Sequence, residues 1–165
     1  MGLELAAALL ASGKLTNEVA IAAAISALDE GLDSESLRLV FYETPGSSGT
    51  IRLFAAALSE LGIPVPPRDE ASLTIARVYA RQILDGRVTP YEGARRIWWE
   101  LANEPGAGPS LRVFVGLASE WEDAPRHRPE YEAEIMSAAQ ELANGEAPTR
   151  SGTAPPVAGG YERQE

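Results

Sequence analysis

The chain has 165 residues, 45% of them hydrophobic, and its 24 acidic and 14 basic side chains give a net charge of −10 at pH 7. This length is typical of one domain, and the hydrophobic content excludes a largely disordered protein. The absence of cysteine excludes disulfides, thiolate metal sites and cysteine nucleophiles. Nucleic acids and anionic membranes both require clustered Lys and Arg, so we expect this acidic chain to bind neither.

Four helices are predicted in the first half of the chain. The apolar run in residues 1–14 has no basic residue ahead of it and ends at Gly13, which favours a first helix over a signal peptide or a membrane anchor. The next three helices are expected over residues 16–31, 34–43 and 50–62. Ser or Thr residues mark where they begin, and Gly residues and proline-containing segments mark where they end.

Four more helices are predicted in the second half, over residues 69–86, 89–103, 109–120 and 129–145. Thr89 and Glu92 have the spacing of a capping box, with Pro90 at the first helical position. No segment has the sustained alternation that predicts strands, so we expect an all-α fold, a compact bundle of about eight helices. Residues 146–165 have no apolar period and are predicted to be a disordered tail.

The two halves of the chain resemble each other. Residues 13–41 align with residues 86–115 at an offset of 73, and a single insertion then changes the offset to 74. The Ser-Leu-Arg tripeptide that begins at Ser36 thereby aligns with the one that begins at Ser110. We predict an internal duplication within one helical domain, residues 1–145, whose four-helix halves span about 1–66 and 69–145 and pack together.

Two adjacent tryptophans are expected to play different roles. Trp98 continues an apolar stripe of its helix, and its counterpart in the first half is Ile25, so we predict that it lies in the core. Trp99 lies about 100° further round the helix, and its counterpart is Ser26. We expect the Trp99 ring to lie under the longer loop of the second half; the alternative is an exposed anchor for a partner.

That longer loop, predicted over residues 118–131, is the largest departure from the repeat, and inserted loops often carry function. Its acidic run and its arginines either pair locally or contact a partner. The one histidine is flanked by arginines, a poor environment for a cation, so no metal and no cofactor is expected. The candidate partner-binding residues are Trp99, Arg95, Arg96, Glu120, Trp121, Glu122, Asp123, Arg126, His127 and Arg128.

No catalytic motif is present, neither GxSxG nor HExxH, and neither a phosphate-binding glycine loop nor a dinucleotide fingerprint. We therefore expect a non-catalytic, cytoplasmic protein-interaction domain. Its narrower form is an inhibitor or immunity-type protein for a basic partner, because acidic groups speed the encounter with a basic protein. The alternative is a helical bundle that binds or hydrolyses a small molecule with carboxylates near Glu100 and Glu120.

Overall fold

The computed structural model describes residues 2–104, 107–146 and 148. Over these residues the chain forms eight α-helices and one short 3-10 turn, without a strand, so the all-α prediction is confirmed. Of the tail predicted to be disordered, only residues 146 and 148 belong to the described part, and the rest lies outside it.

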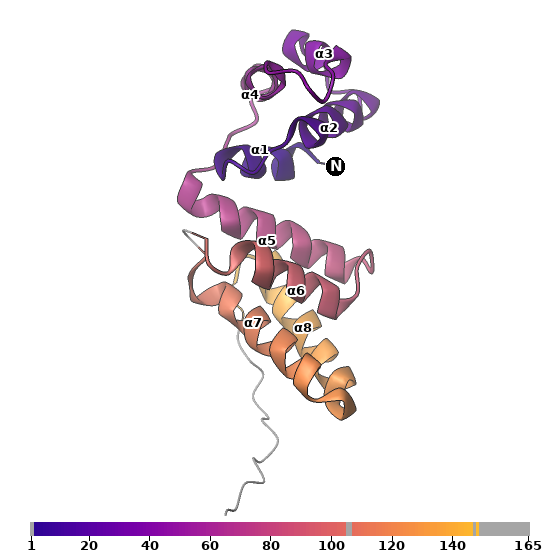
Figure 1. Ribbon diagram of the computed structural model, residues 1–165, viewed down its shortest axis with the longest axis vertical. Coiled ribbons are helices and arrows are strands. Elements are labelled where there is room, and N and C mark those ends of the chain that lie inside the picture. The colour runs from indigo at the N-terminus through magenta and orange to yellow at the C-terminus, as the bar shows by residue number, and fades with distance from the viewer. Residues whose placement is uncertain (1, 105–106, 147, 149–165) are drawn as a thin grey trace, which may run out of the picture.

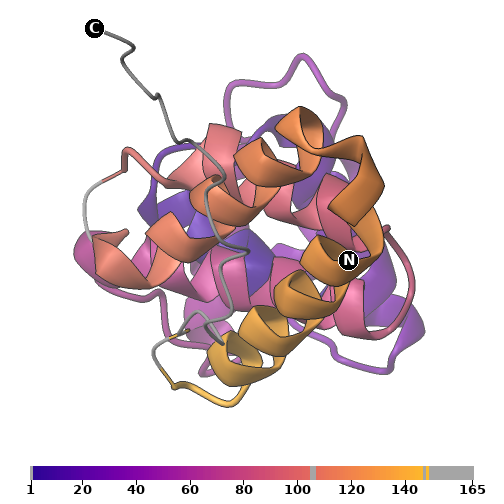
Figure 2. The ribbon, with the colours of Figure 1, turned by 90° about the horizontal axis from the view of Figure 1, so that it is seen from below.

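The helices form two groups of four. The first group consists of α1 (Leu3–Ala11), α2 (Asn17–Asp29), α3 (Glu35–Tyr42) and α4 (Thr50–Glu60). The second consists of α5 (Arg68–Leu84), α6 (Pro90–Leu101), α7 (Gly108–Asp123) and α8 (Arg128–Ala143), with the 3-10 turn Pro125–His127 before α8. Figure 1 shows the first group above the second, with α1 next to α5 where they meet, and Figure 2 shows the molecule from the α7–α8 end.

Side-chain caps begin the helices that the sequence marks with Thr or Ser. Thr16 and Ser34 each accept a hydrogen bond from the backbone N–H three residues on. The predicted capping box is present, because the Glu92 N–H donates to Thr89 Oγ1 and the Thr89 N–H donates to Glu92 Oε2, both at 3.2 Å. These bonds satisfy N–H groups that have no partner within the helix.

Each group of helices encloses its own hydrophobic core. Phe54 belongs to the first core and Phe114 to the second, and both side chains are fully buried. Among the described residues, α1 is the helix that contributes buried side chains to both cores. Leu3, Ala6 and Ala7 belong to the first core, whereas Leu5 and Ala8 belong to the second.

The same pairs of helices are in contact within each group. The first helix of each group touches the second and fourth, the third touches the second and fourth, and the second touches the fourth. The groups are joined by the contact of α1 with α5. A duplicated chain is expected to have this arrangement, but the duplication itself rests on the sequence alignment and stays a prediction.

The prediction of a loop over residues 118–131 is wrong. α7 continues to Asp123, the 3-10 turn follows Ala124, and α8 begins at Arg128. The physical reason is that the apolar stripe of α7 does not stop at the buried Leu117 and Ala118 but continues one turn further to Trp121, which packs against the second core. The insertion therefore lengthens a helix.

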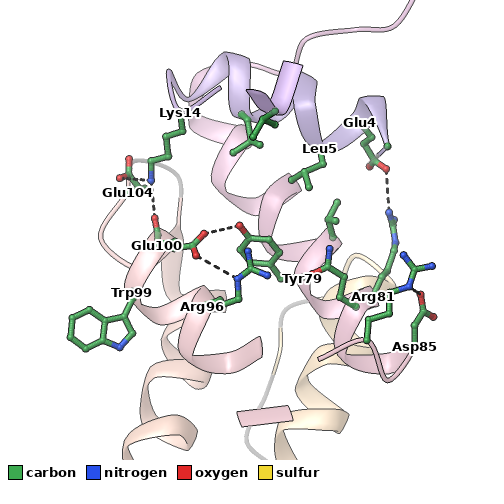
Figure 3. Close-up of a pocket in the computed structure, with 16 residues that line it drawn as sticks. Glu4, Leu5, Lys14, Tyr79, Arg81, Asp85, Arg96, Trp99, Glu100 and Glu104 are labelled. Atoms are coloured by element: carbon green, nitrogen blue, oxygen red, sulfur yellow. Dashed lines mark hydrogen bonds and ion pairs between the residues drawn. The ribbon is translucent and has the colours of Figure 1, made fainter. Parts of the chain in front are cut away.

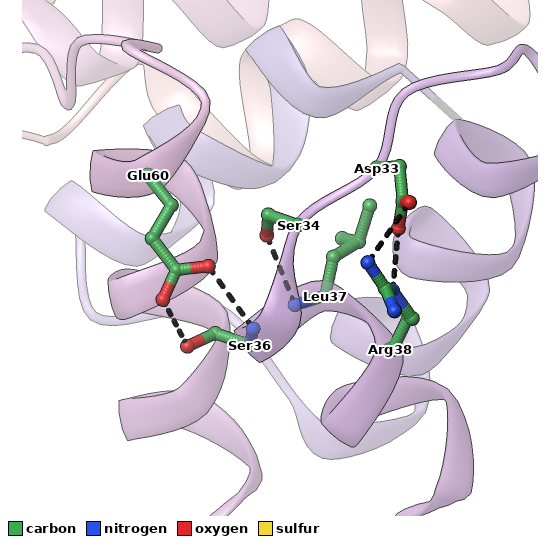
Figure 4. A network of polar contacts seen from close by, with 6 residues as sticks. All are labelled: Asp33, Ser34, Ser36, Leu37, Arg38 and Glu60. Carbon is green, nitrogen blue, oxygen red and sulfur yellow. Dashed lines mark hydrogen bonds and ion pairs between the residues drawn. The ribbon is translucent and has the colours of Figure 1, made fainter.

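The N-terminus of α3 is closed by a carboxylate from α4 (Figure 4). The Ser36 N–H and hydroxyl donate to the two oxygens of Glu60 at 3.0 and 2.5 Å. These hydrogen bonds lower the pKa of Glu60, because they favour the ionised form, and the bond from the Ser36 hydroxyl has the largest effect. A negative charge is also favoured beside the free N–H groups of a helix start. α3 has only 8 residues and is too short to persist alone, so this contact helps to hold it.

We predict that Glu60→Gln lowers stability in a pH-dependent way. The folded-state pKa lies below the ordinary value, so the contribution of the charge is present above the unfolded-state pKa and is lost as the pH falls through the folded-state pKa. Urea unfolding at pH 7 and at about pH 3 should show a difference from wild type at neutral pH that shrinks in acid. In a Ser36→Ala background the effect should be smaller, because the hydroxyl's hydrogen bond is lost while the N–H bond remains, and its full persistence there would contradict this role for the Ser36 hydroxyl.

α5 and α6 are in tight contact at Gly93. A Cβ atom at this position would lie 2.2 Å from Ile83 Cγ1 and 2.5 Å from Ile83 Cδ1, closer than packed atoms allow. Gly93 and Ile83 are both buried. The absence of a side chain at residue 93 therefore permits the Ile83 side chain to pack against α6.

We predict that Gly93→Ala destabilises the protein by about 1 to 3 kcal/mol, because the added methyl group overpacks the α5–α6 contact. Denaturant unfolding measures the effect, with Gly46→Ala, which adds a methyl group in open space, as the control. In the Ile83→Ala background the same substitution should cost less, since the clashing atoms are gone. Equal costs in both backgrounds would show that the close approach is not the cause.

Candidate functional site

A groove of about 800 Å³ lies where the two groups of helices meet, between α1 and the α5–α6 pair (Figure 3). Leu5, Leu9 and Val78 supply apolar surface to it. Its charged lining has equal numbers of basic and acidic side chains, which are Lys14, Arg81, Arg87, Arg96, Glu4, Asp85, Glu100 and Glu104. The groove is thus locally neutral in a strongly acidic chain.

Two ion pairs connect the first group of helices with the second across this groove. Lys14 Nζ lies 2.8 Å from Glu104 Oε1 and also donates to the backbone oxygen of Glu100 at 2.8 Å. At the other end, Arg81 pairs with Glu4 at 3.2 Å. Both pairs are partly exposed, so each contributes little to stability, but together they hold α1 in place along the groove.

A hydrogen-bonded group of three side chains lies between these ion pairs. The Tyr79 hydroxyl donates to Glu100 Oε2 at 2.6 Å, and Arg96 Nε donates to Glu100 Oε1 at 3.5 Å. The Arg96 guanidinium also lies 4.4 Å from the centre of the Tyr79 ring. Burial, assisted by the hydrogen bond to Glu100 and its charge, raises the pKa of Tyr79 to about 12. Tyr79 therefore stays protonated at neutral pH, and both oxygens of Glu100 are engaged.

Trp99 lies at the rim of the groove and is 70% exposed, so the prediction that a loop covers it is wrong. The lengthened α7 reaches Tyr91 instead, eight residues and about 12 Å before Trp99 along α6. The Arg95 guanidinium lies 6.0 Å from the centre of the Trp99 ring. A second hollow of about 560 Å³ shares Arg96, Trp99 and Glu100 with the groove and extends to Val88 and Arg95.

Trp98 packs against the second core, as predicted, but its side chain is half-buried. Its ring lies 5.7 Å from that of Trp99, at an angle of 39°. Trp98 thus contacts the core, while the adjacent ring of Trp99 is mostly exposed.

Trp121, another predicted site residue, is packed between two side chains of its own chain. Its ring is stacked on that of Tyr91 with centroids 3.8 Å apart, and the Arg128 guanidinium lies 3.9 Å from its centre. Trp121 Nε1 donates to Glu132 at 3.1 Å, and the Tyr91 hydroxyl donates to Glu122 at 2.5 Å. These contacts tie α6, α7 and α8 together, so a partner would meet residues that are already engaged.

The other predicted site residues lie at the α7–α8 turn. Asp123, Arg126 and His127 are exposed, Glu120 is half-buried, and His127 Nδ1 is 3.9 Å from Glu130. Tyr91 connects the turn with Trp99 along α6. Its ring stacks on that of Trp121, and Arg95 and Trp99 follow it at successive spacings of four residues. Trp99, Arg95 and the residues near the turn thus form a strip along α6, whereas Arg96 lies in the groove over Tyr79.

Sequence reasoning named Arg96, Trp99 and Glu100, which line the groove, but did not bring them together with Tyr79 and Lys14. Tyr79 and Lys14 lie far from Glu100 in sequence, and their contacts depend on how α1 packs against α5. The only available signal was that Lys14 is the one lysine of the chain, which says nothing about its position in space.

No group of three or more His, Asp or Glu side chains in the described part of the chain is arranged to hold a metal ion. No helix of that part is long and apolar enough to span a lipid bilayer. Comparisons of the chain with protein-family models, with curated proteins and with solved structures give no match. The site must therefore be interpreted from its own geometry.

We predict that the two adjacent tryptophans differ in their effect on stability. Trp98→Ala removes a ring packed against the core and should cost about 3 kcal/mol, at the low end for aromatic truncation because the ring is half-buried. Trp99→Ala should change stability by less than about 0.5 kcal/mol, as at ordinary surface positions. Denaturant unfolding of both variants checks this, and equal losses would contradict the assignment of the two faces.

Proposed function

We propose that this chain is a non-catalytic protein-interaction domain that docks its partner on the side of α6 that carries Trp99 and Arg95. The observation that supports this most strongly is the exposure of Trp99, a large apolar ring that lines both hollows. Leaving such a ring in water has a cost that burial against a partner removes. Trp and Arg are also the side chains most enriched at the energetic centres of protein interfaces.

Arg95 supports the same surface. It is exposed, and among the described residues it forms no ion pair with a carboxylate. The neighbouring Arg96, in contrast, bonds to Glu100. A partner that places a carboxylate over Arg95 would gain a hydrogen-bonded ion pair without breaking one in this chain.

The narrower form of the proposal is an inhibitor or immunity-type protein for a basic partner. The net charge of −10 attracts a basic protein over a distance and speeds the encounter. Glu120, Glu122 and Asp123 concentrate acidic groups at the far end of the strip along α6. In this form the acidic surface steers the partner, and Trp99 holds it once it has docked.

A second candidate function is the binding of a small molecule in the groove between α1 and α5–α6. It is favoured by the groove's volume of about 800 Å³, which lies within the usual range of ligand sites, and by the Tyr79–Glu100 hydrogen bond inside it. Both Glu100 oxygens already accept hydrogen bonds, so the arrangement favours binding over acid–base chemistry. Native mass spectrometry of the purified chain, with Tyr79→Phe for comparison, would detect a retained ligand.

We predict that Trp99→Ala accelerates dissociation of a partner recovered with the full chain from native extract. The expected factor is about 30, which corresponds to the ~2 kcal/mol loss of an interface centre, while the association rate changes little. Surface plasmon resonance measures both rates. Tyr42→Ala is the matched control, because Tyr42 is 79% exposed and belongs to the other group of helices. Equal dissociation rates for wild type and Trp99→Ala would place the docking surface elsewhere.

A further inference from the structure

The side of α6 that carries Trp99 has a self-complementary pattern. Glu92, Arg95 and Trp99 follow one another on α6 at spacings of three and four residues, which is the spacing of a helix-pairing seam. Val88 precedes the helix by two residues and is partly buried against the second core. All four line the hollow of about 560 Å³ beside Trp99. In either direction along the chain, these four side chains are in the order apolar, charged, charged, apolar, and the two central side chains have opposite charges.

We infer that this seam pairs antiparallel with the same seam of a second copy of the chain, about a two-fold axis level with the Gly93–Ala94 peptide. In this register Glu92 faces Arg95 of the second copy, and Val88 faces Trp99 of the second copy. A two-fold interface makes every contact twice. The pair would thus contain two Glu–Arg ion pairs between two Trp–Val contacts. The inference rests on the proposed function in that it uses the same docking surface.

The charges select this register. If the axis moves two residues toward the end of α6, Arg95 faces Arg96 of the second copy, and the juxtaposition of like charges is unfavourable. Trp99 then faces Glu92 and loses its apolar counterpart. The register centred between Gly93 and Ala94 places opposite charges together and apolar groups together at the same time.

The groups that would form the ion pairs are available for them. Arg95 has no carboxylate partner among the described residues. The two hydrogen bonds that Glu92 accepts from Thr89 both end on Oε2, so Oε1 faces no donor in the described part. The same bonds lower the pKa of Glu92, which keeps it ionised at neutral pH. Figure 3 shows the Trp99 ring projecting away from the groove, where a second copy has access.

The size of the seam implies a weak dimer. Its helical part, from Glu92 to Trp99, spans 7 residues, about 10 Å of helix, and such a contact buries less than the ~1,200 to 2,000 Å² of a stable interface. Two chains of charge −10 also repel each other, so association requires salt, which screens the repulsion beyond about 8 Å at 0.15 M. We therefore expect the dimer only at high protein concentration.

Sedimentation equilibrium of the full chain, from about 10 µM to about 1 mM at 0.15 M salt, tests the inference. The mass of wild type should rise from 17.6 kDa toward twice that value as the concentration increases. Arg95→Glu and Glu92→Lys should each stay monomeric, because each places like charges opposite each other. An equimolar mixture of these two variants should dimerise again, because every facing pair in the mixed dimer is then of opposite charge.

Controls separate the seam from other surfaces. Arg112→Glu makes the same charge change at an exposed position on α7 and should leave the dimer unchanged. Glu92→Lys removes half of the capping box, so circular dichroism must show that it is folded, and Trp99→Ala provides a second variant that should be monomeric. A monomeric wild type at every concentration would overturn the inference. So would a dimer that persists in Arg95→Glu and Trp99→Ala, or a mixture that stays monomeric while both variants are folded.

The outcome is distinguishable from that for the proposed function. A monomeric chain whose partner dissociates faster after Trp99→Ala would refute the dimer and support the docking surface. A Trp99-dependent dimer whose partner is unaffected by Trp99→Ala would support the inference and refute the proposed role of that surface for the partner.

Discussion

The packing of α1 between two hydrophobic cores is the contact on which the arrangement of the molecule depends. One face of this helix completes the first core with Leu3, Ala6 and Ala7, and the other supplies Leu5 and Ala8 to the second. Small side chains suit a helix with neighbours on both sides, because they allow close approach. The groove also follows from this packing, since α1 forms one of its walls while α5 and α6 form the other. A change in how α1 packs would therefore alter both cores and the groove together.

Features set by local chemistry could be predicted from the sequence. The starts of α2, α3 and α6 are determined by Thr16, Ser34 and Thr89, whose side chains cap backbone groups only three residues away. The apolar stripe that places Trp98 against the second core is also local, because it depends on helical spacing alone. The end of α7 was not predictable in this way. Trp121 extends that helix because its ring stacks on Tyr91 of α6, thirty residues earlier, and no neighbouring residue signals this contact.

The candidate site shows the same division. The helical position of Trp99 indicated a face different from that of Trp98, but whether anything covers that face depends on the path of α7. Similarly, Trp121 and Arg128 looked like free side chains of a loop, and the structure instead stacks the Trp121 ring on Tyr91 and places the Arg128 guanidinium over the Trp121 ring. Exposure of an aromatic ring is a property of the assembled fold. A sequence can indicate which rings leave the core of their own helix, but not which are covered by another helix.

Lys14 is the only lysine of the chain, and its amine is bonded to both the Glu104 carboxylate and the Glu100 carbonyl at one end of the groove. The ammonium is thus the sole side-chain amine available to acylating reagents or enzymes. Acylation would remove its positive charge and two of its three N–H donors, leaving Glu104 without its counter-ion. One covalent event at a single amine would then break the ion pair at this end of the groove while every other charged side chain of the groove remained chemically intact.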